Sequence, residues 1–170
     1  MNPGRSGGYE VHDAAYREKV RSGFESQTFM KTLGATLEAV EPGYCEVHLP
    51  FRKDLCQHTG FLHAGVTTTI ADNACGFAAL TLMPPDSEVL SVEFKMNLLR
   101  PAVGEKLVAR ATVIRPGRTV TVVQAEVGAV SDNEEKPCGF MVATMMCLAV
   151  PGASGSGPED AAAELKDPAG

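Results

Sequence analysis

The segment 64–83 constrains the fold of this chain more than any other. It is apolar on nearly every face of a helix, and it ends before Pro84-Pro85, which cannot continue one. A membrane span of this composition would have to bury Asp72, Asn73 and three consecutive threonines, which is costly for a lone helix. A helix without a polar stripe is normally covered by the rest of its own protein. We therefore predict a buried central helix in a soluble, cytoplasmic protein with no membrane partner.

Alternating apolar residues and clusters of Val and Thr predict strands around this helix. Gly, Pro and Asn-containing turns separate them. Two short helices are expected first, at 13–23 with Asp13 as its cap and at 26–33. The predicted strands are 35–40, 44–50, 89–99, 106–114, 119–130 and 140–150. This order predicts the α+β class, with a curved antiparallel sheet wrapped around one long central helix.

Length and composition indicate one domain and exclude several partners. The chain has 170 residues, and its net charge of −6 argues against nucleic acid, which requires a concentrated basic surface. Five cysteines without a C-x-x-C pair favour a reducing compartment. No secretory signal is expected, since residues 1–8 have no apolar run. We predict one domain at 10–150, with disordered ends at 1–9 and 151–170 that are rich in Gly, Ala and Pro.

The residues around the start of the central helix carry the chemistry. Ala64-Gly65 allows a ligand to approach the first N–H groups of the helix, which have no internal partner and can stabilise a carbonyl oxygen under attack. Asp72 is the only acid inside the apolar helix, and a buried carboxylate must be paired or functional. Asp72 lies seven positions after Gly65, about 10 Å along the axis. We therefore expect the two features to meet only across two subunits of a symmetric oligomer.

Three stretches carry a family resemblance. QHTGFLHAGVTTTIADNA, SVEFKMNLLRPA and GEKLVARATVIRPGRTVTVVQAEV resemble hot-dog-fold acyl-coenzyme A thioesterases of the PaaI (phenylacetate-degradation) type. The similarity extends over roughly 24–150. It implies the hot-dog fold, hydrolysis of an acyl-coenzyme A thioester, a homodimer or homotetramer with its site at a subunit interface, and no cofactor, since coenzyme A is part of the substrate.

The resemblance also implies roles for individual residues. Asp72 would be the general base or nucleophile, and Gln57 would orient the water or the thioester. The N–H of Ala64, with that of Gly65, would polarise the carbonyl; the family pattern has Gly where this chain has Ala64, and alanine keeps the N–H. His63 would support the loop, and the hydroxyl of Ser91 would lie near the reacting centre. Arg118, followed by Arg115 and Arg100, would contact the phosphates of coenzyme A.

Other interpretations of these residues remain open. Cys56, His58 and His63 suggest a metal site, but no fourth ligand has suitable spacing, so no metal is expected. Cys75 is expected to pack rather than to react. Non-catalytic acyl-coenzyme A binding, or a hydratase or dehydratase using His63 with Asp72, are the alternative functions. The acyl group is not fixed by the sequence; Phe61, Leu62, Phe77 and Met96 are possible pocket walls or simply core residues.

Overall fold

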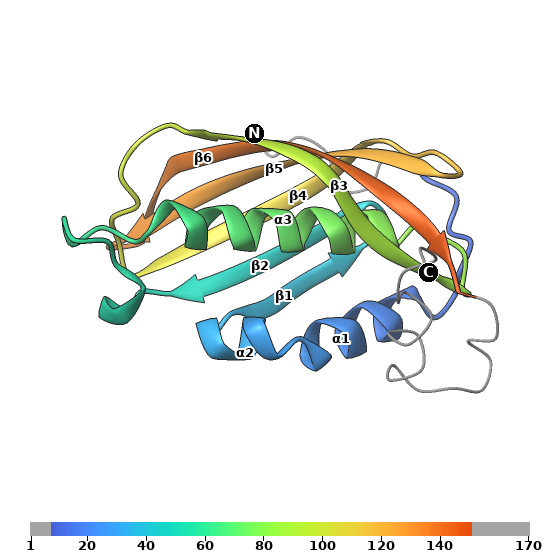
Figure 1. The fold of residues 1–170 in the computed structure, drawn as a ribbon, viewed down its shortest axis with the longest axis horizontal. Coiled ribbons are helices and arrows are strands. Elements are labelled where there is room, and N and C mark those ends of the chain that lie inside the picture. Colours follow the sequence, from blue (N-terminus) through green and yellow to red (C-terminus); the bar gives the residue numbers. More distant parts are fainter. Residues whose placement is uncertain (1–7, 151–170) are drawn as a thin grey trace, which may run out of the picture.

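The computed structural model describes residues 8–150, so the disorder predicted for 1–7 and 151–170 falls outside the described part of the chain. Two short helices precede the first strands, and one long helix separates the second strand from the third (Figure 1). The helices are α1 (Tyr16–Ser26), α2 (Thr28–Leu33) and α3 (Ala64–Leu80), with a 3₁₀ turn at Lys53–Leu55. The strands are β1 (Thr36–Glu41), β2 (Tyr44–Pro50), β3 (Ser87–Leu98), β4 (Lys106–Arg115), β5 (Val120–Ser131) and β6 (Glu134–Ala149).

All six strands form one antiparallel sheet in the order β1-β2-β4-β5-β6-β3. The sheet curves along α3, which lies across its inner face (Figure 1). The predicted α+β architecture, a curved sheet around one long helix, is confirmed. It follows from the composition of α3, because a helix buried on most sides needs a sheet that bends around it.

The core lies between α3 and the inner face of the sheet. Small residues of α3, among them Ala71, Ala74 and Ala78, are completely buried and let the helix approach the strands closely. Every second residue of β4 from Leu107 to Val113 is buried against it. Burial of the Cys75 thiol raises its pKa, in keeping with the expected packing role.

The two edges of the sheet differ in how they are covered. Helix α1 packs beside β1, and the Arg17 Nε donates a hydrogen bond to the carbonyl of Val40 over 3.3 Å. The β3 edge carries exposed apolar side chains, with Leu90 50%, Val92 54% and Phe94 44% exposed. Within the described residues, therefore, β1 is blocked and β3 is left open for pairing.

Several element boundaries differ by one to three residues from those predicted, and the start of β6 differs by six. Helix α1 begins three residues later than expected because the Asp13 carboxylate accepts the N–H of Ala15 and holds a turn ahead of the helix. Strand β6 begins at Glu134 and not at 140, since Asp132 and Asn133 adopt φ of 51° and 62°, the conformation of a two-residue type I′ hairpin turn. Pro137 is tolerated inside β6 because pairing with β3 stops at Gly139.

Candidate active site

The first turn of α3 is held by the side chain that precedes it. His63 is the N-cap, and its Nδ1 accepts the N–H of Gly65 over 2.9 Å. The ring therefore has an unprotonated Nδ1, and a Cβ at position 65 would lie 3.0 Å from that nitrogen. Because the Gly65 N–H is occupied by this cap, the N–H of Ala64 is the one at the helix start that has no acceptor among the described residues.

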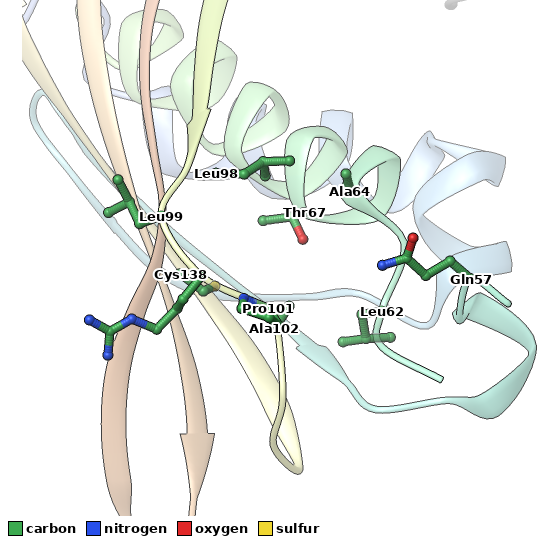
Figure 2. A pocket seen from close by; sticks show the side chains of 10 residues that line it. Gln57, Leu62, Ala64, Thr67, Leu98, Leu99, Pro101, Ala102 and Cys138 are labelled. Carbon is green, nitrogen blue, oxygen red and sulfur yellow. The ribbon is translucent and has the colours of Figure 1, made fainter. Parts of the chain in front are cut away.

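A folded loop places Gln57 opposite this N–H group. The backbone of Gln57 bonds to Phe61 and Gly60 over 2.8 and 2.9 Å, and Gly60 takes a φ of 85° to close the turn. A bridge between Cys56 and Leu62 holds the base of the loop. The side chain of Gln57 has no hydrogen-bond partner among the described residues, and Figure 2 shows its amide directed between Ala64 and Leu62.

These residues surround a cavity of about 280 Å³ at the start of α3 (Figure 2). Its walls come from the loop before α3, from α3 itself, from the end of β3 with the segment that follows, and from β6. The lining residues are Gln57, Leu62, Ala64, Thr67, Leu98, Leu99, Arg100, Pro101, Ala102 and Cys138. Of the four residues proposed as pocket walls, Leu62 lines this cavity, whereas Phe77 packs against Phe24 with ring centroids 5.9 Å apart.

Asp72 forms a second polar centre, on the part of α3 that faces β3. The Ser91 hydroxyl donates to the Asp72 Oδ1 over 2.8 Å, and a bulge in the pairing of β3 with β6 begins at Ser91. Partial burial raises the pKa of the Asp72 carboxyl, while the hydrogen bond from Ser91 acts in the opposite direction. A half-buried carboxylate with one hydroxyl donor is suited to accept a proton from water or to attack a carbonyl.

The predicted site residues thus fall into three groups. Gln57, Ala64 and Arg100 line the cavity, with His63 and Gly65 beside them. Asp72 lies farther along α3, about 12 Å from Ala64 by the rise of eight helical residues, and Ser91 of β3 is hydrogen-bonded to it. Arg115 and Arg118 lie at the β4–β5 turn, at the end of the sheet where α3 finishes and away from the cavity (Figure 1).

The cavity also contains residues that the sequence did not single out. Thr67 and Cys138 are 2% and 1% exposed and line it, together with Leu98 and Ala102. Thr67 is one of three consecutive threonines with no local feature to distinguish it, and Cys138 lies 71 residues later in the sequence. Only the pairing of β3 with β6 and their packing on α3 brings them together.

Within residues 8–150 no group of three or more His, Cys, Asp or Glu side chains is placed to hold a metal ion. In the same part of the chain, no helix combines the length and apolarity needed to cross a bilayer. His63, considered with Asp72 for dehydratase chemistry, is nine residues from it along the chain, and its Nδ1 is engaged by the N–H of Gly65.

Comparison with known proteins identifies relatives of this chain. Residues 59–136 match the thioesterase superfamily model. The crystal structure of a thioesterase family protein from Silicibacter pomeroyi is 47% identical, with a TM-score of 0.78 over 79% of this chain and 98% of that one. Human acyl-coenzyme A thioesterase 13 is 27% identical over 65% of this chain and 79% of its own length.

The PaaI protein of Escherichia coli shares the fold, with a TM-score of 0.72 and 17% identity over 82% of this chain and 97% of that one. The resemblance drawn from the sequence is confirmed by these matches. The chain belongs to the thioesterase superfamily and is a thioester hydrolase with the hot-dog fold.

Proposed function

We propose that this protein hydrolyses acyl-coenzyme A to a free acid and coenzyme A, with Asp72 as base or nucleophile. The observation that carries the proposal is the pair of features on α3: a desolvated carboxylate held by Ser91, and the unpaired Ala64 N–H at the helix start with Gln57 opposite. The name of the human relative supports a coenzyme A thioester as substrate.

The two features supply complementary parts of the reaction. With Asp72 as base, its carboxylate takes a proton from water as the oxygen adds to the thioester carbonyl carbon. The Ala64 N–H, at the positive end of α3, stabilises the oxyanion, and the Gln57 amide orients the thioester. The intermediate collapses with cleavage of the C–S bond, and the proton on Asp72 passes to the departing thiolate. With Asp72 as nucleophile, its carboxylate adds to the carbonyl carbon and the C–S bond breaks, which gives an acyl–aspartyl anhydride and the coenzyme A thiolate, and the thiolate takes a proton from solvent. Water then hydrolyses the anhydride to the free acid and restores the Asp72 carboxylate.

The separation along α3 supports a site shared by two subunits. Ala64 and Asp72 are eight positions apart on α3, about 12 Å along its axis, and one carbonyl cannot contact both within one chain. Antiparallel pairing of two open β3 edges about a two-fold axis directs the Ser91 end of one strand toward the Leu98 end of the other, beside its cavity. The exposed apolar residues of β3 would be buried by this pairing. We propose a homodimer of this kind, alone or within a homotetramer, with two equivalent sites.

The three arginines have different positions in this arrangement. Arg100 borders the cavity of its own subunit. Arg115 and Arg118, at the other end of the sheet, can approach that cavity only from the partner subunit. Either arrangement provides guanidinium groups for the phosphates of coenzyme A, with Arg118 as the first candidate.

The first experiment follows thiol release from a panel of acyl-coenzyme A substrates, with wild type and Asp72→Asn. We expect wild-type turnover, a fall in kcat of at least a hundredfold in Asp72→Asn, and little change in acyl-coenzyme A affinity. Saturable binding without hydrolysis by folded wild type would favour a binding protein instead.

A complementation experiment tests the shared site. Asp72→Asn and Gln57→Ala, each impaired alone, are unfolded together and refolded as a mixture. If each site combines Asp72 of one subunit with Gln57 of the other, half of the dimers are mixed and each of these has one intact site. Activity then recovers to about a quarter of wild type by that count. No recovery, with mixed dimers demonstrated by mass, would place the whole site in one subunit.

A further inference from the structure

The backbone of β3 offers hydrogen-bonding groups to its open edge at alternate positions only. The Leu99 N–H, just after the end of β3, donates to the Cys138 carbonyl over 3.0 Å, so position 99 faces β6. In an antiparallel pair, residues whose N–H and C=O point toward the neighbouring strand alternate with residues whose groups point away from it. The odd-numbered residues 93–99 therefore bond to β6, and the even-numbered residues 94–98 present their N–H and C=O groups to the open edge.

The side chains of β3 alternate between the two faces of the sheet in the same step. Phe94 is paired with Ala143, which is completely buried, so the even-numbered side chains lie on the face that carries α3. Glu93 and Lys95 are exposed on the outer face. The Glu93 Oε1 accepts the Thr144 hydroxyl, and Lys95 has no ion pair or hydrogen bond among the described residues. An acidic and a basic residue thus flank Phe94 on the open edge strand.

A second β3 can pair with the first about a two-fold axis in only a few registers. Two residues that face each other must both present their backbone groups to the shared edge or both turn them away, so their numbers differ by an even amount. The axis then passes at one residue, which faces its own copy in the partner subunit. Near the middle of the open edge, this residue is 93, 94, 95 or 96.

The charges on the outer face distinguish these registers. An axis at Glu93 or at Lys95 sets two like charges directly opposite each other, which destabilises a strand pair. An axis at Met96 sets Lys95 opposite the partner's Asn97 and gives neither charge an opposite one. An axis at Phe94 sets Glu93 of each strand opposite the partner's Lys95, which makes two ion pairs.

Resting on the proposed function, we infer that two copies of this chain recognise each other through β3 in the register centred on Phe94, with reciprocal ion pairs between Glu93 and Lys95. The two Phe94 side chains, each 44% exposed in the single chain, meet at the axis on the inner face of the joined sheet. This apolar contact drives association, because burial removes both rings from water. Exposed ion pairs contribute little affinity, so their role is to select one register.

The register decides whether the shared site is complete. With the axis at Phe94, Ser91 of one subunit lies beside the partner's Leu98, which lines the cavity that also contains Ala64. Moving the axis by one residue slides one strand past the other by two residues, about 7 Å. A hydrogen bond spans only about 3 Å. A slide of this size therefore separates Asp72 from a carbonyl bound at the partner's Ala64.

A charge exchange tests the ion pairs. Glu93→Lys and Lys95→Glu each set like charges opposite each other at both contacts, so we expect each variant alone to dimerise about tenfold or more weakly than wild type. An equimolar mixture of the two variants restores two opposite pairs, and it should form a heterodimer with a Kd and a rate of thiol release close to those of wild type. Lys106→Glu, the same charge change on β4, is the control and should dimerise as wild type does. Sedimentation equilibrium and native mass spectrometry measure the species.

A cross-link reports the register directly. The Cα atoms of a hydrogen-bonded antiparallel pair are about 5.5 Å apart, within the span of a disulfide. Phe94→Cys should therefore form a covalent dimer on mild oxidation. Met96→Cys should not, because with the axis at Phe94 the two copies of Met96 lie four residues apart, about 13 Å along the strands. The native cysteines are present in both variants, so the difference between the variants reports the new position.

These measurements follow association and not turnover, so they separate the inference from the proposed function. A covalent dimer from Met96→Cys and none from Phe94→Cys would overturn the inference, as would a mixture of the two charge variants that stays monomeric. Absence of hydrolysis by a wild type whose Phe94→Cys variant cross-links would reject the proposed function alone. Hydrolysis by wild type, together with failure of the charge exchange and of the Phe94→Cys cross-link, would reject the register alone.

Discussion

The Asp72 carboxyl is subject to two opposing influences that can be separated by mutation. Partial burial raises its pKa, and the hydroxyl of Ser91 partly offsets that effect by donating to the charged form. As a base or nucleophile, Asp72 must be ionised. Activity is therefore lost as the pH falls through this raised pKa, at a higher pH than for an ordinary aspartate.

Removing the Ser91 hydroxyl should move that acidic limit. In Ser91→Ala only the burial effect remains, so the pKa of Asp72 rises further and the acidic limb of the kcat/KM profile shifts to higher pH. Ser91 is a positioning residue in this account. A loss of activity with an unshifted pH profile would mean that Ser91 acts on the substrate itself.

The His63 cap gives a second prediction for a single residue. His63→Ala should lower the free energy of unfolding by about 1 kcal/mol, the usual cost of losing an N-cap side chain. His63→Asn, whose amide oxygen can accept the same N–H, should recover most of it. His58→Ala, in the exposed part of the same loop, is the control and should leave stability unchanged within about 0.5 kcal/mol. The measurement is equilibrium urea unfolding, and equal losses for His63→Ala and His58→Ala would contradict the capping role.

At the scale of elements, the junction of α1 and α2 is tied to the central helix through one hydrogen bond. The amide Nδ2 of Asn73 donates to the Gln27 Oε1 over 2.6 Å, and the Asn73 Oδ1 is buried without a partner among the described residues. Gln27 is extended, with a ψ of 105°, and separates the two short helices. This hydrogen bond therefore links Gln27, where the chain changes direction between α1 and α2, to Asn73, the residue that follows Asp72 on α3.

Gln27→Ala should be more destabilising than its half-buried position suggests. It leaves the Asn73 amide with neither donor nor acceptor satisfied, and an unpaired buried polar group costs about 1–3 kcal/mol. Gln124→Ala, at another half-buried glutamine without a hydrogen bond among the described residues, is the matched control. Replacing Gln27 and Asn73 together by Leu should cost less than Gln27→Ala, and a double change that costs more would contradict this account.

For the whole molecule, the dimer proposed above forms through the open β3 edge, and its activity depends on that pairing. Val92→Lys places a charge at the bulge in the middle of this edge, a feature that natural sheets use to prevent edge pairing. If the proposed dimer forms through β3, this variant should be a folded monomer with at least a hundredfold lower kcat, since each site would lack the partner's Asp72. Sedimentation and thiol release measure the two effects.

Ile114→Lys is the control for that variant. Ile114 is 51% exposed, close to the 54% of Val92, but it lies on β4, two strands away from β6 and three from β3. It should leave the β3 pairing intact. A dimer that survives Val92→Lys and dissociates with Ile114→Lys would place the interface on the outer face of the sheet.

The sequence by itself determined the class of fold and the chemistry of individual residues. The apolar helix required a wrapping sheet, the alternating segments supplied six strands, and Asp72 was identifiable because a carboxylate in an apolar helix is rare. These are local properties, fixed by periodicity and residue type. Boundaries such as the start of β6 were predicted less well. The type I′ turn before β6 depends on Asp132 and Asn133, and because the residues around them are also polar, the hydrophobic pattern does not indicate where the turn lies.

The tertiary structure alone decided which residues meet. The Gly65 N–H is bonded to His63, Ser91 is paired with Asp72, and Thr67 and Cys138, 71 residues apart in the sequence, line one cavity. The tertiary structure also blocked β1 while leaving β3 open. Such contacts depend on strand register and on the packing of α3 into the sheet, where a shift of one residue reverses the direction of every side chain on a strand. No local pattern in the sequence contains that information.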